Sequence, residues 1–109
     1  MRRRSSSSSE EASHPALRVR VRFIGALAWR AGRDELVLEL PEGSTVLSAL
    51  RKACEELPEL SSLLFNADTG DPRTNFLILL NRKDVDVLGG LSAELADGDE
   101  LTIVPLVRL

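Results

Sequence analysis

The sequence has few of the residues that most catalytic and metal centres are built from. Its 109 residues include one Cys, one His, one Trp and no Tyr. A single cysteine, Cys54, excludes an internal disulfide, and one Cys with one His excludes a metal site of the Cys/His type. No nucleophile–base pair and no Gly-rich phosphate loop is found. We therefore expect neither catalysis by this chain alone nor a bound cofactor.

The sequence also lacks long hydrophobic runs and an excess of positive charge. No stretch approaches the roughly 18 to 20 apolar residues that cross a bilayer, so no membrane association is expected. The 14 Lys and Arg against 17 Asp and Glu give a net charge of −3. Nucleic-acid binding is not expected, because it needs a concentrated basic face. The low cysteine content is most simply that of a cytoplasmic protein.

Residues 1–16 differ in composition from the rest. Arg2, Arg3 and Arg4 precede five serines and two glutamates, and no apolar segment of a secretory signal follows. So polar a segment cannot bury enough surface to offset its ordering entropy. We expect residues 1–16 to be a disordered polar tail, in which His14 has no catalytic role, and residues 17–109 to form one domain.

Hydrophobic periodicity predicts the first elements of that domain. Residues 17–23 and 35–40 alternate apolar and polar side chains, which is typical of strands with one buried face, and the short connection between them, 26–32, favours an antiparallel hairpin. Apolar residues at helical spacing predict a helix over 46–57, capped by Ser44 or Thr45 and stopped by Pro58. Residues 60–65 are predicted to form an irregular turn or short helix.

The second half predicts more strands. Residues 76–80 are apolar at every position, so this strand has both faces covered or one face reserved for a partner. A short return strand is expected at 85–87 and a last strand at 100–104, ended by Pro105. With one main helix, one face of the sheet stays open, an α+β arrangement. The predicted core comprises Leu17, Val19, Val21, Phe23, Leu36, Leu38, Leu40, Val46, Leu50, Cys54, Leu57, Leu101 and Ile103.

Isolated candidate residues favour structural roles. Cys54 lies on the apolar stripe of the helix and is interpreted as a core cysteine. Trp29 is interpreted as a cap over the edge of the core, and Asp97 and Asp99 as parts of a tight turn with solvated carboxylates. The alternating arginines of the first strand are assigned to the solvated open face, because no exposed aromatics that could stack bases lie among them.

Several short segments, in order and spacing, resemble one family. They are Val21-Arg22-Phe23, Ala31-Gly32-Arg33, Leu40-Pro41-Glu42-Gly43-Ser44-Thr45-Val46, Leu80-Asn81, Leu88-Gly89-Gly90-Leu91, Leu95-Ala96-Asp97-Gly98-Asp99 and Ile103-Val104-Pro105. From about Leu17 to Val107 the chain resembles the small subunit of molybdopterin synthase (MoaD), the thiamine sulfur carrier ThiS, and the ubiquitin-related and archaeal small modifiers. The resemblance implies a ubiquitin-like β-grasp, with a mixed four- to five-stranded sheet and one main helix across one face.

The resemblance implies a protein substrate rather than an enzyme. In the family, an E1-like adenylyltransferase activates the terminal carboxylate, which becomes a thiocarboxylate or is joined to a lysine. The reactive tail ends in Gly-Gly, because two residues without Cβ can thread into an active site. Here Leu109 stands where the first of these glycines would be. The internal Gly89-Gly90 is about nineteen residues away and is interpreted as a turn.

Three hypotheses follow. The chain is a divergent member that docks onto partners but is poorly activated; or it is an active sulfur carrier in molybdopterin (molybdenum cofactor) biosynthesis or a protein modifier; or it is an unrelated β-grasp binding module.

The strand at 76–80 predicts the docking surface. If Phe76, Ile78 and Leu80 point to the helix, as the resemblance suggests, Leu77 and Leu79 point to the open face. We expect docking onto an E1-like enzyme or a molybdopterin-synthase-like large subunit, or homodimerisation, because monomers rarely expose large apolar patches. Pro105 should release the strand, so that the chain projects beyond it. The predicted partner-binding residues are Leu77, Leu79, Val104, Leu106, Val107 and Arg108, with Leu109 as the activation position.

Overall fold

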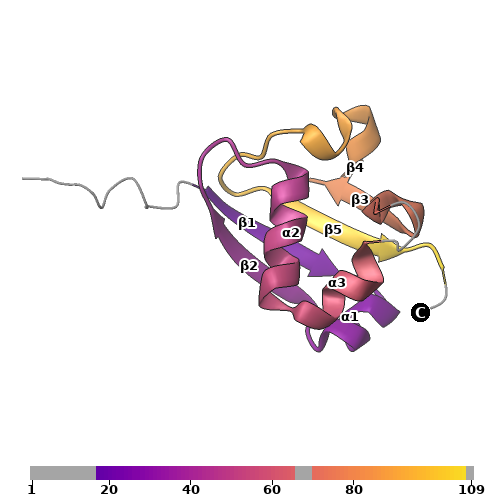
Figure 1. The fold of residues 1–109 in the computed structure, drawn as a ribbon. Coiled ribbons are helices and arrows are strands. Elements are labelled where there is room, and N and C mark those ends of the chain that lie inside the picture. Colours follow the sequence, from indigo (N-terminus) through magenta and orange to yellow (C-terminus); the bar gives the residue numbers. More distant parts are fainter. Residues whose placement is uncertain (1–16, 66–69, 108–109) are drawn as a thin grey trace, which may run out of the picture.

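The computed structural model describes residues 17–65 and 70–107 (Figure 1). Residues 1–16, and with them the predicted polar tail and His14, lie outside the described residues. The regular elements are β1 (Leu17–Phe23), α1 (Ala26–Ala31), β2 (Glu35–Leu40), α2 (Val46–Glu56), α3 (Pro58–Leu64), β3 (Phe76–Leu80), β4 (Lys83–Asp84) and β5 (Glu100–Pro105). Three single-turn 3₁₀ helices add to these, namely η2 (Pro72–Thr74), η3 (Val85–Val87) and η4 (Gly90–Ser92).

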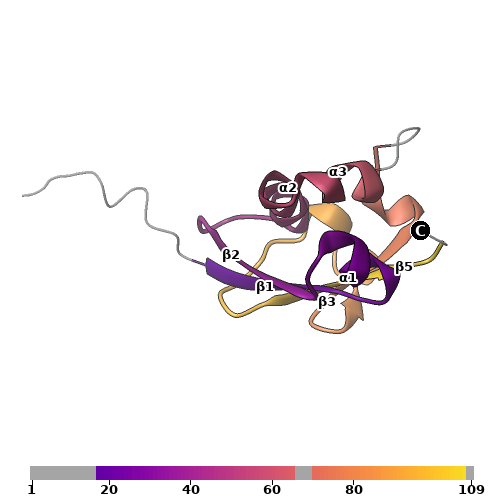
Figure 2. The same ribbon diagram turned by 90° about the horizontal axis from the view of Figure 1, so that it is seen from below.

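Five strands form one mixed sheet in the order β2-β1-β5-β3-β4. The strand β1 is antiparallel to β2 and parallel to β5, while β3 is antiparallel to both of its neighbours. Helices α2 and α3 lie on one side of the sheet (Figure 2), and this leaves the other side open. The predicted α+β class, hairpin, mixed sheet and open face are therefore confirmed.

The core lies between the sheet and α2. Every second residue of β1 is buried, and the same alternation holds in β2 and β3, because successive side chains of a strand point to opposite faces. On α2, Val46, Ala49, Leu50 and Ala53 are buried. The helix begins at Thr45, whose side chain accepts from the Ser48 N–H while the Ser48 hydroxyl accepts from the Thr45 N–H, a capping box that satisfies two free donors.

The connection after β1 differs from the prediction. Residues 26–31 form a helical turn and a half, α1, which buries Leu27 and ends at Gly32 with a left-handed φ of 80°. The prediction that Trp29 caps the core edge is wrong, because its side chain is 83% exposed. Leu27 takes the inward position instead. Six residues are too few for helical periodicity to be recognised in a sequence.

Other boundaries shift by a few residues. Cys54 and Leu57 are only partly buried at the margin of the core, while Leu60 and Leu64 of α3 are fully inside it. The predicted return strand at 85–87 is instead the 3₁₀ helix η3, because the Asp84 carboxylate accepts from the Asp86 N–H and turns the chain. The two residues before it, β4, pair with β3.

Candidate docking surface and carboxyl-terminal segment

The open face of the sheet divides into a charged half and an apolar half. The charged half carries the outward side chains of β1 and β2, in which arginines face glutamates across the strands. Ion pairs join Arg18 to Glu39 at 3.2 Å and Arg20 to Glu35 at 3.3 Å. Glu100 on β5 lies 3.6 Å from Arg20 and 4.0 Å from Arg22. The arginine stripe is therefore matched by glutamates on both sides and is solvent-exposed, as predicted.

The apolar half comes from β3 and β5. Its cross-strand pairs are Leu77 with Val104 and Leu79 with Thr102, and all four residues are partly buried. The prediction that Phe76, Ile78 and Leu80 point to the helix side is confirmed, since all three are buried. Arg22 lies beside Thr102, and Asp84 beside Leu79. This arrangement gives an apolar centre with a charged rim, which is the anatomy of a protein interface.

The chain leaves the sheet one residue later than predicted. Pro105 still belongs to β5, and the Leu106 N–H donates to the Asn75 carbonyl at 2.8 Å, so Pro105 does not release the strand. Proline can occupy this position because the bond to β3 comes from the next residue. Leu106 is 60% and Val107 45% exposed. We call Leu77, Leu79, Val104 and Leu106 the apolar patch.

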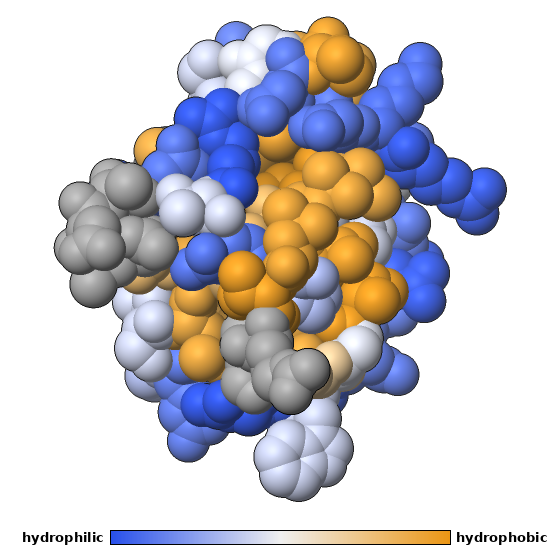
Figure 3. All heavy atoms as spheres, turned by 90° about the vertical axis from the view of Figure 1, so that its right-hand side faces the viewer, coloured by the Kyte–Doolittle hydropathy of each residue, from blue (hydrophilic) through white to orange (hydrophobic). Residues whose placement is uncertain are grey.

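The end of β5 is also hydrophobic on the surface. Figure 3 shows apolar side chains gathered in the middle of the face where the carboxyl terminus leaves the domain. Ile24 contributes to the apolar surface near this end, since its N–H donates to the Ile103 carbonyl and its side chain is 36% exposed. Arg108 and Leu109, which complete the predicted site, lie outside the described residues.

The sequence matches the ThiS family over residues 21–108. The chain belongs to the ThiS family. This family comprises β-grasp sulfur carriers and modifiers of the ThiS and MoaD type, so the predicted fold and family are confirmed. Its members are small protein carriers or modifiers rather than enzymes. No curated protein matches the chain.

Solved structures resemble this ThiS-family chain closely. Small archaeal modifier protein 1 from Methanosarcina acetivorans is 29% identical with a TM-score of 0.70, covering 85% of this chain and 96% of its own. CysO from Mycobacterium tuberculosis is 26% identical with a TM-score of 0.68, covering 82% and 99%. A chain of the BexX/CysO complex from Amycolatopsis orientalis is 27% identical with a TM-score of 0.65, covering 84% and 98%. The similarity thus extends over nearly the whole of each of these proteins.

The single thiol of this ThiS-family domain is not activated. Cys54 lies on α2 at the margin of the core, and its side chain faces Ser61 of α3. Burial raises the pKa of the Cys54 thiol to about 11, and a hydrogen bond with Ser61 opposes this only in part. Since the thiolate is the nucleophile, this supports the structural interpretation of Cys54.

The carboxylates of the predicted tight turn bind the backbone instead of being simply solvated. Asp97 accepts from the Arg18 N–H at 2.8 Å. Asp99 accepts from the Ala96 N–H at 2.7 Å and from the side-chain amide of Asn81 at 2.9 Å. The turn itself is confirmed, with Gly98 at a φ of 88°. Both aspartates thus anchor the start of β5 to β1 and to the end of β3.

The internal glycine pair is also a turn, as predicted. Gly89 and Gly90 have φ values of 111° and 77°, a region that favours glycine. Across residues 17–65 and 70–107, no three His, Cys, Asp or Glu side chains are grouped to hold a metal ion. No helix in the same residues is long and apolar enough to cross a membrane.

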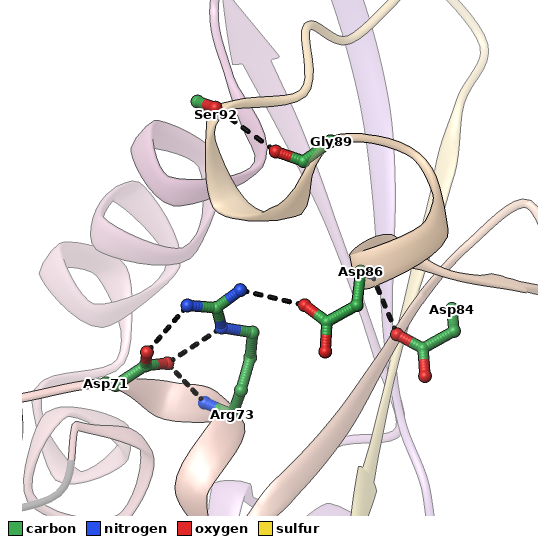
Figure 4. Close-up of polar contacts among 6 residues, drawn as sticks. All are labelled: Asp71, Arg73, Asp84, Asp86, Gly89 and Ser92. Carbon is green, nitrogen blue, oxygen red and sulfur yellow. Dashed lines mark hydrogen bonds and ion pairs between the residues drawn. The ribbon is translucent and has the colours of Figure 1, made fainter.

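Sequence reasoning missed one polar cluster, formed by Asp71, Arg73 and Asp86 (Figure 4). The Arg73 guanidinium donates twice to Asp71, at 2.7 and 3.0 Å, and once to Asp86 at 2.8 Å. It therefore ties η2 to η3, and we call these three residues the Arg73 clamp. The Asp71-Pro72-Arg73 turn is visible in the sequence, but a partner thirteen residues away is not.

Proposed function

We propose that this ThiS-family protein acts by docking onto an E1-like adenylyltransferase or a molybdopterin-synthase-like large subunit. The apolar patch is the contact surface, and Val107, Arg108 and Leu109 enter the partner. The observation that carries the proposal is the separation of the open face into two halves, one with its charges paired and one apolar. Membership of a family of protein carriers and modifiers supports it.

The apolar patch suits a partner because of its position. Val104 lies on β5, the strand that leads to the carboxyl-terminal segment, and Leu77 and Leu79 lie on the neighbouring strand β3. Leu106 extends the patch along that segment. A partner that covers the patch is thereby held next to the end of the chain. Contact with the apolar patch would then hold the terminal carboxylate of the chain in position to react, and such positioning accelerates a reaction between two molecules.

The finer proposal concerns Leu109. In the family this position is a glycine, and a partner channel shaped for glycine is overfilled by a leucine side chain. Overfilling a packed site costs about 1 to 3 kcal/mol, and about 1.4 kcal/mol slows a reaction tenfold. We therefore expect the chain to dock normally and to accept AMP or sulfur slowly.

A second candidate function is that of an active carrier or modifier. The similarity to small archaeal modifier protein 1 and CysO, over nearly their whole lengths, favours it. In that case the partner's channel accommodates leucine. Both functions require the same docking surface and differ only in how fast Leu109 reacts.

Docking is tested with Leu79→Asp, which places a charge at the centre of the apolar patch. The matched control is Val37→Asp, the same change on the charged half of the same face, where Val37 is 48% exposed. Titration calorimetry against purified E1-like enzymes and large subunits should show binding weakened at least about tenfold by Leu79→Asp and kept in Val37→Asp. Circular dichroism should show both variants folded.

Two outcomes would overturn the docking proposal. Equal binding by the wild type and both variants would remove the apolar patch from the interface. A concentration-dependent dimer that Leu79→Asp abolishes, measured by light scattering, would make a second copy of this chain the occupant of the patch instead.

A further inference from the structure

The strand β2 is an edge of the sheet, and its outer side carries unpaired backbone groups. It pairs with β1 alone. The Phe23 N–H donates to the Asp34 carbonyl, so this opposite pair is hydrogen-bonded. In an antiparallel pair of strands, every second residue bonds to the partner strand. Leu36, Leu38 and Leu40 therefore bond to β1. The N–H and C=O groups of Glu35, Val37 and Glu39 point away from β1. In the described part of the chain no other strand covers them.

The same three residues present their side chains on the open face. Glu35, Val37 and Glu39 are exposed, whereas the alternate leucines are buried. A strand added at this edge would therefore find three residues with free backbone groups. Their side chains are acidic at Glu35, apolar at Val37 and acidic at Glu39. Asp34 and Glu42, at the two ends of the strand, are also exposed and add to the acidity of this edge.

Charge alternates strand by strand across this half of the sheet. Glu100 on β5 pairs with Arg20 and Arg22 of β1. On the other side of β1, Arg18 pairs with Glu39 and Arg20 with Glu35, both on β2. The side chains of Glu35 and Glu39 remain 46% and 57% exposed, and a carboxylate accepts more than one donor. A row of basic side chains is the complement that the next strand would have to supply, because opposite charges across strands are favourable.

A second copy of the chain does not fit this edge when β2 pairs along its whole length with β2 of the other copy. Centred on Val37, two antiparallel copies would place Glu35 of each opposite Glu39 of the other, and like charges directly opposite are destabilising. The glutamates thus disfavour self-pairing of the edge. They do not oppose a basic segment.

We propose that the outer edge of β2 is a strand-addition site for an extended segment of a partner protein. The segment carries Lys or Arg at two positions four residues apart, opposite Glu39 and Glu35, with an apolar residue midway that contacts Val37. Backbone hydrogen bonds to Glu35, Val37 and Glu39 hold it, and the charges select it. This site lies at the β2 edge of the sheet and is separated by β1 from the apolar patch on β5 and β3, so both can be occupied together.

The test uses amide hydrogen exchange with a capped peptide, Ser-Lys-Thr-Val-Thr-Lys-Ser. In the free protein, the amides of Glu35, Val37 and Glu39 should exchange fast and those of Leu36 and Leu38 slowly. The peptide should slow amide exchange of Glu35, Val37 and Glu39 by about tenfold or more and leave the exchange of Leu36 and Leu38 unchanged. A peptide with Glu in place of both Lys is the charge control and should have no effect.

Val37→Pro is the matched backbone variant. It removes an N–H that points away from β1, so the β1–β2 ladder and the melting temperature should be kept while peptide protection is lost. Protection by the acidic peptide as well, or protection that persists in Val37→Pro, would overturn the proposal. So would slow exchange of Glu35, Val37 and Glu39 without peptide, because the edge would then already be covered.

Discussion

At the residue scale, the packing of α2 on the sheet depends on side chains such as Leu50. Leu50 is fully buried in the hydrophobic core. All strand residues that were predicted to point inward are buried. Apolar and polar residues alternate along each strand, so only one orientation of the strand places the apolar side chains in the core. Trp29 and Cys54 fit less well, because their positions depend on how helices pack, which local periodicity does not determine.

Leu50→Ala should lower the free energy of unfolding by about 2 to 5 kcal/mol, through lost transfer energy and the cavity left behind. Urea denaturation measures it. Leu47→Ala, a change on the same helix at a partly buried position, is the control and should cost less. A loss below about 0.5 kcal/mol for Leu50→Ala would contradict its place in the core.

Cys54 makes stability depend on alkaline pH. Burial raises the pKa of its thiol from an ordinary value of 9.0 to about 11. The folded state thus holds the thiol proton more tightly than the unfolded state does. The stability that Cys54 contributes in this way is complete below pH 9 and is lost as the pH rises from 9 to 11. Modification by a thiol reagent at neutral pH should be slower in the folded protein than in urea. In Cys54→Ala the alkaline loss of stability should be smaller, and an identical loss would contradict the assignment.

At the scale of elements, the segment between α3 and β5 carries most of what the sequence did not predict. Apart from β3, its pieces are short: the single turns η2 and η3, in which an Asp side chain accepts from the backbone, and the two-residue strand β4. Elements this short have no periodicity to recognise, and their hydrogen bonds connect residues well apart in the sequence. The longer α2 was predicted to within a residue because Thr45 and Pro58 mark its limits and four buried residues repeat along it.

The Arg73 clamp should stabilise η3 against local opening. Arg73→Ala removes the three side-chain bonds and should speed amide exchange in Val85–Val87, while the global stability falls by about 1 kcal/mol or less, because the ions are partly exposed. Arg30→Ala, at an exposed position of α1, is the control and should change neither the η3 exchange nor the global stability. Unchanged exchange in η3 would show that the clamp does not hold it.

The clamp also responds to acid. Its hydrogen bonds with Arg73 hold the pKa of Asp71 below its ordinary value. The folded state therefore favours the charged carboxylate, and this stabilisation is present at neutral pH and lost as the pH falls below about 4 through the lower folded value. The protection factors of the η3 amides, which correct for the intrinsic pH dependence of exchange, should fall over that range in the wild type and change less in Arg73→Ala.

At the scale of the whole molecule, the order of strands and helices predicted the α+β class, and the resemblance to one family added the β-grasp. A hairpin, a helix and a last strand beside the first leave one sheet face uncovered, and the structure has this arrangement. The division of that face into a charged and an apolar half was only partly predictable. It depends on the register that sets Leu77 opposite Val104 and Arg20 beside Glu100, and register comes from the assembled sheet.

The central claim is that the domain docks through the apolar patch and that the Leu109 side chain slows its activation. Intact mass spectrometry after incubation with ATP, a sulfur donor and an E1-like enzyme tests it most directly. The chain should gain AMP or sulfur at least about tenfold more slowly than a variant with two glycines in place of Leu109, while both bind the enzyme equally. Efficient thiocarboxylate formation on the chain with Leu109, at the rate of the glycine variant, would contradict the claim.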